Sequence, residues 1–458
     1  MSQTPYPGAI SGVVPRIAVK ADHVPRTETG IGALMPWADR LWFVTYVAHK
    51  SASGGGTGLF WLDDDLNLTK HPESVVGTYA NRLVHDETNQ LFIGPHVIDT
   101  QGNVRTVADL VDTRLTATMR HLDDPANKVY VLGMEGEFLE LDVHTLAVRQ
   151  LADLREVLDT PVHPHFKDGI TRHGRVVVVN NSYYHDDFTA GRSEGRLAEW
   201  DGTTWRTLAE TQFNTLGSAN GIGDAIYAVG QDRASALFWV FLPETGWQRY
   251  RLPKSTHTQD HAFTTEWPRI REVESERLLL DASGMFYELP SMTYDNRVWG
   301  IRPIASHLRV VGDFCSWNGL LVLAGDQTTP IGGSNPIAGQ PQANLWFGKT
   351  DDLWSFGKPQ GWGGPWWESD IIADQPSDPF LMTGFEHKCL HLSHLADTAV
   401  DFEVQLDFMG NGTWHTMETV RLPERGYHCL VFPTGVSAHW VRIVPSVSCV
   451  ATAQFAYT

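Results

Sequence analysis

Residues 128–143 read KVYVLGMEGEFLELDV, and their pattern is the clearest indication of the fold. Its two apolar runs, KVYVLGM and EFLELDV, are rich in Val, Leu, Phe and Tyr, and residues of this kind favour strands. The short Glu-Gly gap between the runs leaves room only for a tight turn. The stretch therefore predicts two neighbouring strands joined by a hairpin.

The same pattern recurs along most of the chain, whereas helical periodicity is scarce. The other copies are RLWFVTYVA (40–48) with GLFWLDDD (58–65), QLFIGPHVID (90–99), RVVVVNNSYY (175–184) with RLAEWDG (196–202), DAIYAVGQD (224–232) with LFWVFLPETG (237–246), RLLLDASGMFYELP (277–290), and GLLVLAGD (319–326) with NLWFGKTDDLW (344–354). The seven copies repeat about every 46 residues, which is the length of one four-stranded propeller blade. We expect an all-β protein in which residues 1–375 form a seven-bladed β-propeller.

The repeat ends at GKPQGWGGPWWESDIIADQPSDP (357–379), a segment rich in Gly, Pro and Trp. Alternating apolar and polar residues follow in VDFEVQLDF (400–408) and HWVRIVP (439–445). We expect residues 376–458 to form a small C-terminal β-sandwich.

Charge limits the partners of this protein. Its 35 Lys and Arg against 54 Asp and Glu leave a net charge of −19, which repels nucleic acid and anionic membranes. An anionic ligand must therefore meet a local cluster of cations. The beginning of the chain shows no apolar run of signal-peptide length, and no segment approaches 18 uninterrupted apolar residues. We expect a soluble protein, cytoplasmic as written or secreted or periplasmic if a leader was removed; its oligomeric state is left open.

The four cysteines, Cys315, Cys389, Cys429 and Cys449, show no CxxC spacing. This argues against a zinc knuckle and leaves two alternatives, buried free thiols or one disulfide near the C-terminus. His163, His165, His257 and His261 could hold a structural metal ion, but their spacing matches no standard zinc motif. We predict no metal-ligand set and no required cofactor.

The innermost strand of a propeller blade lines the central channel, so residues at its beginning face a shared opening. In this pattern four cations are expected at such positions in four blades: Arg82, Arg120, Lys167 and Arg269. The ends of the second strands bring further groups to the same face: His96, Glu135, Tyr183, Tyr184 and Arg233. The loop THTQDHAFTTEWPRIRE (256–272) adds His261 and Trp267. A compact anion such as a uronic acid carboxylate suits these cations, although they could instead tie blades together through Glu266 and Glu272.

Several strings resemble the propeller-fold polysaccharide lyases, namely the ulvan lyases and rhamnose-glucuronate lyases, and the related propeller-fold rhamnosidases. They are HPHFKDGITRHGRVVVVNNSYY (163–184), GRLAEWDGTTW (195–205), RLPKSTHTQDHAFTTEWPRIREV (251–273) and GMFYELP (284–290), within roughly residues 75–300. The resemblance implies a histidine before the fourth-blade strand, which is His165, and a tyrosine acid or base, which is Tyr184 or Tyr183. It also implies an arginine that neutralises the uronate, which is Arg196, with Arg269 as a second candidate.

We expect a polysaccharide or oligosaccharide lyase that works by β-elimination, with a glycoside hydrolase and a non-catalytic glycan-binding protein as the alternatives. A lyase would remove the C5 proton of a uronate whose charge is neutralised by arginine, with His165 and Tyr184 as base and acid. A glycoside hydrolase would use carboxylates such as Glu135, Asp186, Asp187 and Asp232, or a histidine such as His96 or His165. A glycan-binding protein would need no chemistry at all. In each case the partner is an anionic oligosaccharide or polysaccharide.

Overall fold

The computed structural model describes residues 12–13, 17, 19–20, 29–47, 57–160, 163–182, 195–219, 225–256, 268–293, 295–329 and 340–458. Within these ranges almost all regular structure is β, as the sequence predicts. Helical turns are short: α1 (Leu154–Val157), η2 (Ala108–Leu110) and η3 (Thr350–Ser355). No helix in the described ranges has the length and apolar character to cross a membrane.

Consecutive strands along the chain form four-stranded antiparallel sheets. The first three sheets are β3 (Thr29–Trp37), β4 (Arg40–Val47), β5 (Leu59–Leu62) and β6 (Leu68–Lys70); β7 (Arg82–His85), β8 (Gln90–Ile93), β9 (His96–Ile98) and β10 (Val104–Thr106); and β11 (Leu115–Arg120), β12 (Lys128–Gly133), β13 (Glu137–Asp142) and β14 (Val148–Asp153). The two strands predicted from residues 128–143 are thus β12 and β13.

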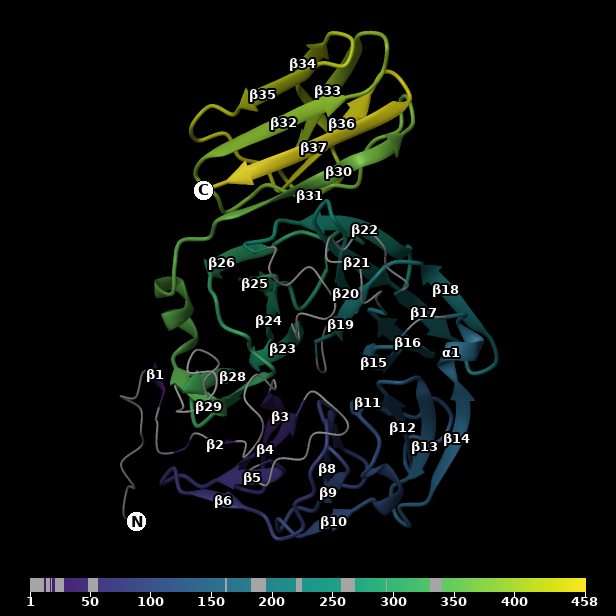
Figure 1. The fold of residues 1–458 in the computed structure, drawn as a ribbon, viewed down its shortest axis with the longest axis vertical. Helices are drawn as coiled ribbons and strands as arrows, with labels where there is room; N and C mark the ends of the chain where they lie inside the picture. Colours follow the sequence, from purple (N-terminus) through teal and green to yellow (C-terminus); the bar gives the residue numbers. More distant parts are fainter. Residues whose placement is uncertain are drawn as a thin grey trace.

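The next three sheets repeat this arrangement. They are β15 (Phe166–Arg172), β16 (Arg175–Asn180), β17 (Arg196–Trp200) and β18 (Trp205–Ala209); β19 (Phe213–Gly217), β20 (Ile226–Gln231), β21 (Ala236–Leu242) and β22 (Gly246–Leu252); and β23 (Arg269–Glu274), β24 (Arg277–Ala282), β25 (Met285–Leu289) and β26 (Arg302–Ser306). Figure 1 shows the sheets around a common centre, with the first strand of each sheet innermost. This arrangement is that of a β-propeller.

The middle strands are apolar on both faces because each sheet is covered by a neighbour on either side. In β16, Val176 and Val178 pack in one cluster with Phe138 of the preceding sheet. Val177 and Val179 pack in another cluster with Phe213 of the following sheet. An unbroken run of four valines therefore fits this strand. If apolar and polar residues alternated here, the polar side chains would be buried on one of the two covered faces.

The last sheet of the ring joins distant parts of the chain. It contains β27 (Phe314–Trp317), β28 (Leu320–Thr329) and β29 (Gln340–Gly348), and β29 also pairs with β1 (Gly12–Val13) and β2 (Val19–Lys20) from near the N-terminus. Ile17, between β1 and β2, is buried in the same core cluster as Phe347 of β29. The first described strands therefore close the ring.

The remaining strands form two further groups, seen at the top of Figure 1. The first group has the strand order β31 (Phe380–Leu381), β36 (Trp440–Pro445), β33 (Val400–Asp407) and β34 (His415–Leu422). On its other side, β31 pairs in parallel with β22 through Phe380 and Arg251. The second group is β30 (Gly361–Ile371), β37 (Cys449–Tyr457), β32 (Lys388–His394) and β35 (Tyr427–Val431). The strand β30 lies before residue 376, where we expected the C-terminal part to begin. The Trp-rich segment forms this strand, and it pairs with β37.

The two C-terminal sheets bury their facing sides against each other. Leu390 of β32, Val404 of β33, Ile443 of β36 and Phe455 of β37 belong to one hydrophobic cluster. Alternate residues on β32 are accordingly buried, and those between them are partly exposed. All four cysteines of the chain are free thiols, so of the two alternatives the disulfide is not formed.

Candidate functional site: the central cavity

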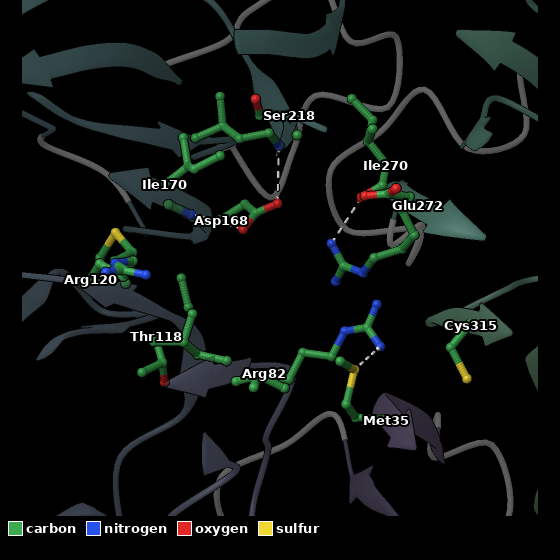
Figure 2. Close-up of a pocket in the computed structure, with 18 of the residues that line it drawn as sticks. Met35, Arg82, Thr118, Arg120, Asp168, Ile170, Ser218, Ile270, Glu272 and Cys315 are labelled. Carbon is green, nitrogen blue, oxygen red and sulfur yellow. Dashed lines mark hydrogen bonds between the residues drawn. The ribbon is translucent and has the colours of Figure 1, made fainter. Parts of the chain in front are cut away.

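A cavity of about 910 Å³ lies where the innermost strands meet. Its walls come from β3, β7, β11, β15, β19, β23 and β27, so every sheet of the ring contributes its first strand. Figure 2 shows Arg82, Arg120, Asp168 and Glu272 around this space, together with Met35 and Cys315. A volume of this size suits a ligand of a few sugar rings.

Two arginines on the cavity wall share one carboxylate. The Nε of Arg82 lies 3.2 Å from Oδ2 of Asp313, and the Nε of Arg271 lies 2.8 Å from Oδ1. The backbone N–H of Leu34 donates a third hydrogen bond to Oδ2 at 2.9 Å. Asp313 precedes β27 and its side chain is fully buried. Burial alone would raise the pKa of Asp313, but the nearby Arg271, Arg82 and Arg269 hold it below its ordinary value.

The two guanidinium groups are held by other contacts as well. Arg82 donates to the backbone oxygens of Leu34 and Phe314 and contacts Sδ of Met35 at 3.2 Å, the contact drawn in Figure 2. The Nη1 of Arg271 donates to the backbone oxygen of Ile270 at 3.1 Å. Among the described residues, Nη2 of Arg271 has no recorded hydrogen-bond partner. Because Arg271 lines the cavity, this nitrogen is available to a ligand.

Asp168 is the second acid on this part of the wall. Its Oδ2 accepts hydrogen bonds from the Thr215 hydroxyl and the Leu216 N–H, both at 3.0 Å. Its Oδ1 accepts from the N–H of Gly169 at 2.9 Å. These bonds join β15 to β19 and fix the carboxylate in place, as Figure 2 shows for the bond to the neighbouring strand.

Arg120 lies at the other end of the cavity, where the sequence pattern does not place it. We expected it at the beginning of an inner strand, but it is the last residue of β11, since that strand begins at Leu115. Its guanidinium pairs with Glu87 and lies 3.5 Å from Oδ2 of Asp86. The position before β11 is instead held by Arg114, whose Nε donates to Glu135 at 2.6 Å.

Arg269, Lys167 and Arg196 are buried, and none of them lines the cavity in the described structure. The Nε of Arg269 donates to the backbone oxygen of Gly312 at 3.0 Å, and burial, with Arg271 nearby, lowers its pKa to about 10. Arg196 donates to the backbone oxygens of Leu158, Gly195 and Asp159. Its guanidinium therefore joins β17 to the end of the preceding sheet.

His165 directly precedes β15, and His96 begins β9. The Nδ1 of His165 lies 2.6 Å from Oδ1 of Asn181. Burial, together with Lys167 and Arg114, lowers the pKa of His165 well below its ordinary value, so the ring is neutral at pH 7. His96 is fully buried with Nδ1 at 3.0 Å from the Thr106 hydroxyl. His96 belongs to the third strand of its sheet, and neither histidine is among the described residues that line the cavity.

The other predicted site residues, Tyr183, Tyr184, His261 and Trp267, lie outside the described residues. Of the predicted cations, the cavity wall brings together Arg82 and Arg120. The sequence analysis missed Arg271 and Asp168, and it noted Asp313 only as the beginning of an inner strand. The signal for Arg271 was its spacing: it follows Arg269 by two residues, so both side chains are on the same face of β23.

No family model matches the chain, and no curated protein matches it. Among solved structures, an oligogalacturonate lyase in complex with manganese is 12% identical, over 69% of this chain and 88% of its own, with a TM-score of 0.38. An oligogalacturonate lyase from Vibrio parahaemolyticus is 10% identical, over 73% and 92%, with a TM-score of 0.39. The β-propeller domain of Cps50 (Swd1) from Myceliophteria thermophila is 11% identical, over 72% and 99%, also with a TM-score of 0.39. Similarities of this level identify neither a substrate nor a reaction.

Proposed function

We propose that the protein is a carbohydrate-active enzyme that binds the carboxylate of a uronate-containing glycan in the central cavity and cleaves the glycan by β-elimination. The observation that carries this proposal is the sharing of Asp313 by Arg82 and Arg271, since both arginines line the cavity. Asp313 and Asp168 together balance part of the charge of Arg82, Arg269 and Arg271. A ligand carboxylate can therefore add a further negative charge.

The geometry of arginine favours this kind of ligand. A guanidinium offers parallel N–H groups that match the two oxygens of a carboxylate. The Nε of Arg271 is directed at Asp313, which leaves Nη2 for the ligand. The wall is stiff at this point because Asp313 also accepts from the Leu34 backbone, so the arginines need little reorganisation on binding.

Elimination needs three groups at the uronate. Arginine neutralises the carboxylate, which makes the C5 proton more acidic and stabilises the enolate that forms. A base takes the C5 proton, the C4–O4 bond breaks, its electron pair leaves with O4, and a C4–C5 double bond remains. We assign the base to His165, whose ring is neutral at pH 7, and the acid that protonates O4 to Tyr184; the sequence resemblance implies a histidine at the first position and a tyrosine acid or base at the second.

We propose that the sheets of the ring are the blades of a seven-bladed propeller and that the two C-terminal sheets form a β-sandwich. The pairing of β30 with β37 favours a division between these two parts before residue 361. In this description Ile17 and Val19 belong to the closing blade.

The test begins with a panel of oligogalacturonates and glucuronate-rhamnose oligosaccharides, each beside its carboxyl-reduced neutral form. We expect unsaturated products, detected by their ultraviolet absorbance and by a mass that lacks one water relative to hydrolysis. Products that have gained water would instead identify a hydrolase. Binding without turnover would identify a glycan-binding protein, and equal handling of the neutral forms would exclude the role of the arginines.

Two arginines of the same sheet provide a matched comparison. Arg271→Gln removes a guanidinium from the cavity wall, and we expect the affinity for the acidic oligosaccharide to fall roughly tenfold to a hundredfold. Arg277→Gln removes an exposed guanidinium paired with Glu288 outside the cavity, and we expect no change. Isothermal titration calorimetry measures both.

Tyr184→Phe should reduce turnover by roughly 100-fold while binding persists.

A further inference from the structure

The C-terminal sheet β30–β37–β32–β35 carries three metal-ligating side chains on its solvent side. Cys389 and His391 are two residues apart on β32, so both point away from the core that Leu390 and Leu392 enter. Cys429 lies on the neighbouring strand β35, directly opposite His391. In the described structure these three form the group whose ligand atoms all lie within 4.8 Å of one another.

We propose that Cys389, His391 and Cys429 bind one zinc ion, with the fourth position of the ion open to water. The Sγ of Cys389 and Nε2 of His391 are 3.6 Å apart. Ligands at about 2.0–2.3 Å from a tetrahedral zinc ion lie roughly 3.3–3.8 Å from each other, so this separation fits an ion between the two atoms. Two thiolates and one imidazole are a donor set that zinc prefers.

The histidine is oriented for this role by a second contact. Its Nδ1 lies 2.9 Å from the hydroxyl of Tyr427, which is on the same face of β35. When Nδ1–H donates to this hydroxyl, the lone pair of Nε2 points toward Cys389. Zinc-bound histidines commonly have such a partner on the other ring nitrogen, which fixes the tautomer and the ring orientation.

A neighbouring amide supplies an unused acceptor. Gln454 on β37 is the register partner of His391 on the other side of β32, and its side chain is mostly buried. Its Nε2 donates to the backbone oxygen of Trp366 at 2.9 Å. Its Oε1 is buried and has no hydrogen-bond partner among the described residues. Within the described ranges, Gln454 therefore leaves one buried acceptor unsatisfied on the strand next to His391.

A disulfide between the two cysteines fits the sheet less well. Cys389 is opposite Val431 and Cys429 is opposite His391, so the two cysteines are diagonal neighbours. Diagonal positions on adjacent antiparallel strands are about 7–8 Å apart, whereas disulfides prefer Cα atoms about 5.5–6 Å apart. A metal ion bridges the longer span without moving the strands.

The experiment uses the full chain, reduced and freed of metal with a chelator. We expect one equivalent of Zn²⁺ to bind in calorimetry, and one equivalent of Co²⁺ to give a thiolate-to-cobalt charge-transfer band that Zn²⁺ then removes. Cys429→Ser should reduce the band, since Cys389 alone remains as a thiolate ligand, and weaken Zn²⁺ binding by roughly 100-fold or more, because one of three protein ligands is lost. Cys449→Ser, which alters a partly buried cysteine outside the group, should change neither.

A conservative variant protects the test against misfolding. Tyr427 is exposed, so Tyr427→Phe should leave the fold intact and weaken Zn²⁺ binding by about tenfold to a hundredfold through the loss of the contact to His391. The proposal is overturned if Co²⁺ gives no charge-transfer band, if Cys449→Ser weakens binding as much as Cys429→Ser, or if mass spectrometry of the air-oxidised protein finds a Cys389–Cys429 disulfide in place of metal binding.

Discussion

Burial controls what single histidines contribute to stability. His96 is fully buried, and its Nε2 has no hydrogen-bond partner in the described structure. Burial, with His71 nearby, lowers its pKa to about 4 from an ordinary value of 6.5. The unfolded chain therefore binds a proton at His96 more readily than the folded chain does. Stability is lost as the pH falls below 6.5, and the loss is complete near pH 4.

We expect protonation of His96 to lower the free energy of unfolding by on the order of 3 kcal/mol as the pH falls through this window. His96→Asn keeps an acceptor beside Thr106 and removes the titrating ring, so the variant should lose less stability between pH 7 and pH 4.5. Urea unfolding at both pH values measures the difference. His415→Asn, at an exposed position on β34, is the control and should behave like the unchanged protein. An identical pH dependence in His96→Asn would contradict the prediction.

At the scale of elements, the inner strands meet through close backbone contacts. The pairing of β3 with β4 shifts register between Ile31 and Ala33, which puts Gly32 at a β-bulge. A Cβ atom on Gly32 would lie 1.9 Å from the backbone oxygen of Tyr79. Tyr79 forms a bridge to Leu115, the first residue of the inner strand β11. Glycine at this position therefore allows β3 to approach the segment between two neighbouring sheets.

We expect Gly32→Ala to lower the free energy of unfolding by about 2 to 3 kcal/mol, because the backbone around Tyr79 must move. Gly174 is the comparison: it has a φ of +68° in the β15–β16 hairpin, and a Cβ there would meet nothing within 4 Å. Gly174→Asn should change stability by less than about 0.5 kcal/mol, since asparagine tolerates positive φ. Chemical denaturation of both variants checks the prediction. It fails if the two variants lose the same stability.

For the whole molecule, closure of the ring depends on residues from the two ends of the propeller sequence. Ile17 is 2% exposed and packs in the same cluster as Leu345 and Phe347. Ile17→Ala should lower stability by about 2–4 kcal/mol, because it leaves a cavity in this cluster. Leu308→Ala, at a side chain that is 95% exposed, should have little effect. Thermal unfolding compares them, and an unchanged melting temperature for Ile17→Ala would show that the N-terminal strands do not hold the ring together.

The strands were predictable because their signal is local. The valines of RVVVVN and the pair KVYVLG and EFLELD each became strands where the apolar runs predicted them. Register was harder: Arg120 was expected at the beginning of an inner strand and lies at its end. An apolar run shows that a strand is present, but it does not show at which residue the strand begins or ends. The residues at the two ends of a buried strand have similar composition, so the pattern does not distinguish one end from the other.

Local patterns of polarity were enough to predict an all-β chain of repeated hairpins and to place Arg82 where an inner strand begins. Which charges meet depends on the tertiary fold. Arg82, Arg271 and Asp313 come from three different sheets, and their contacts depend on how the ring closes. Cys429 likewise meets Cys389 and His391 only through the register of β32 with β35. Such contacts join residues far apart in the chain, and local patterns of polarity carry no information about which distant side chain will be the partner.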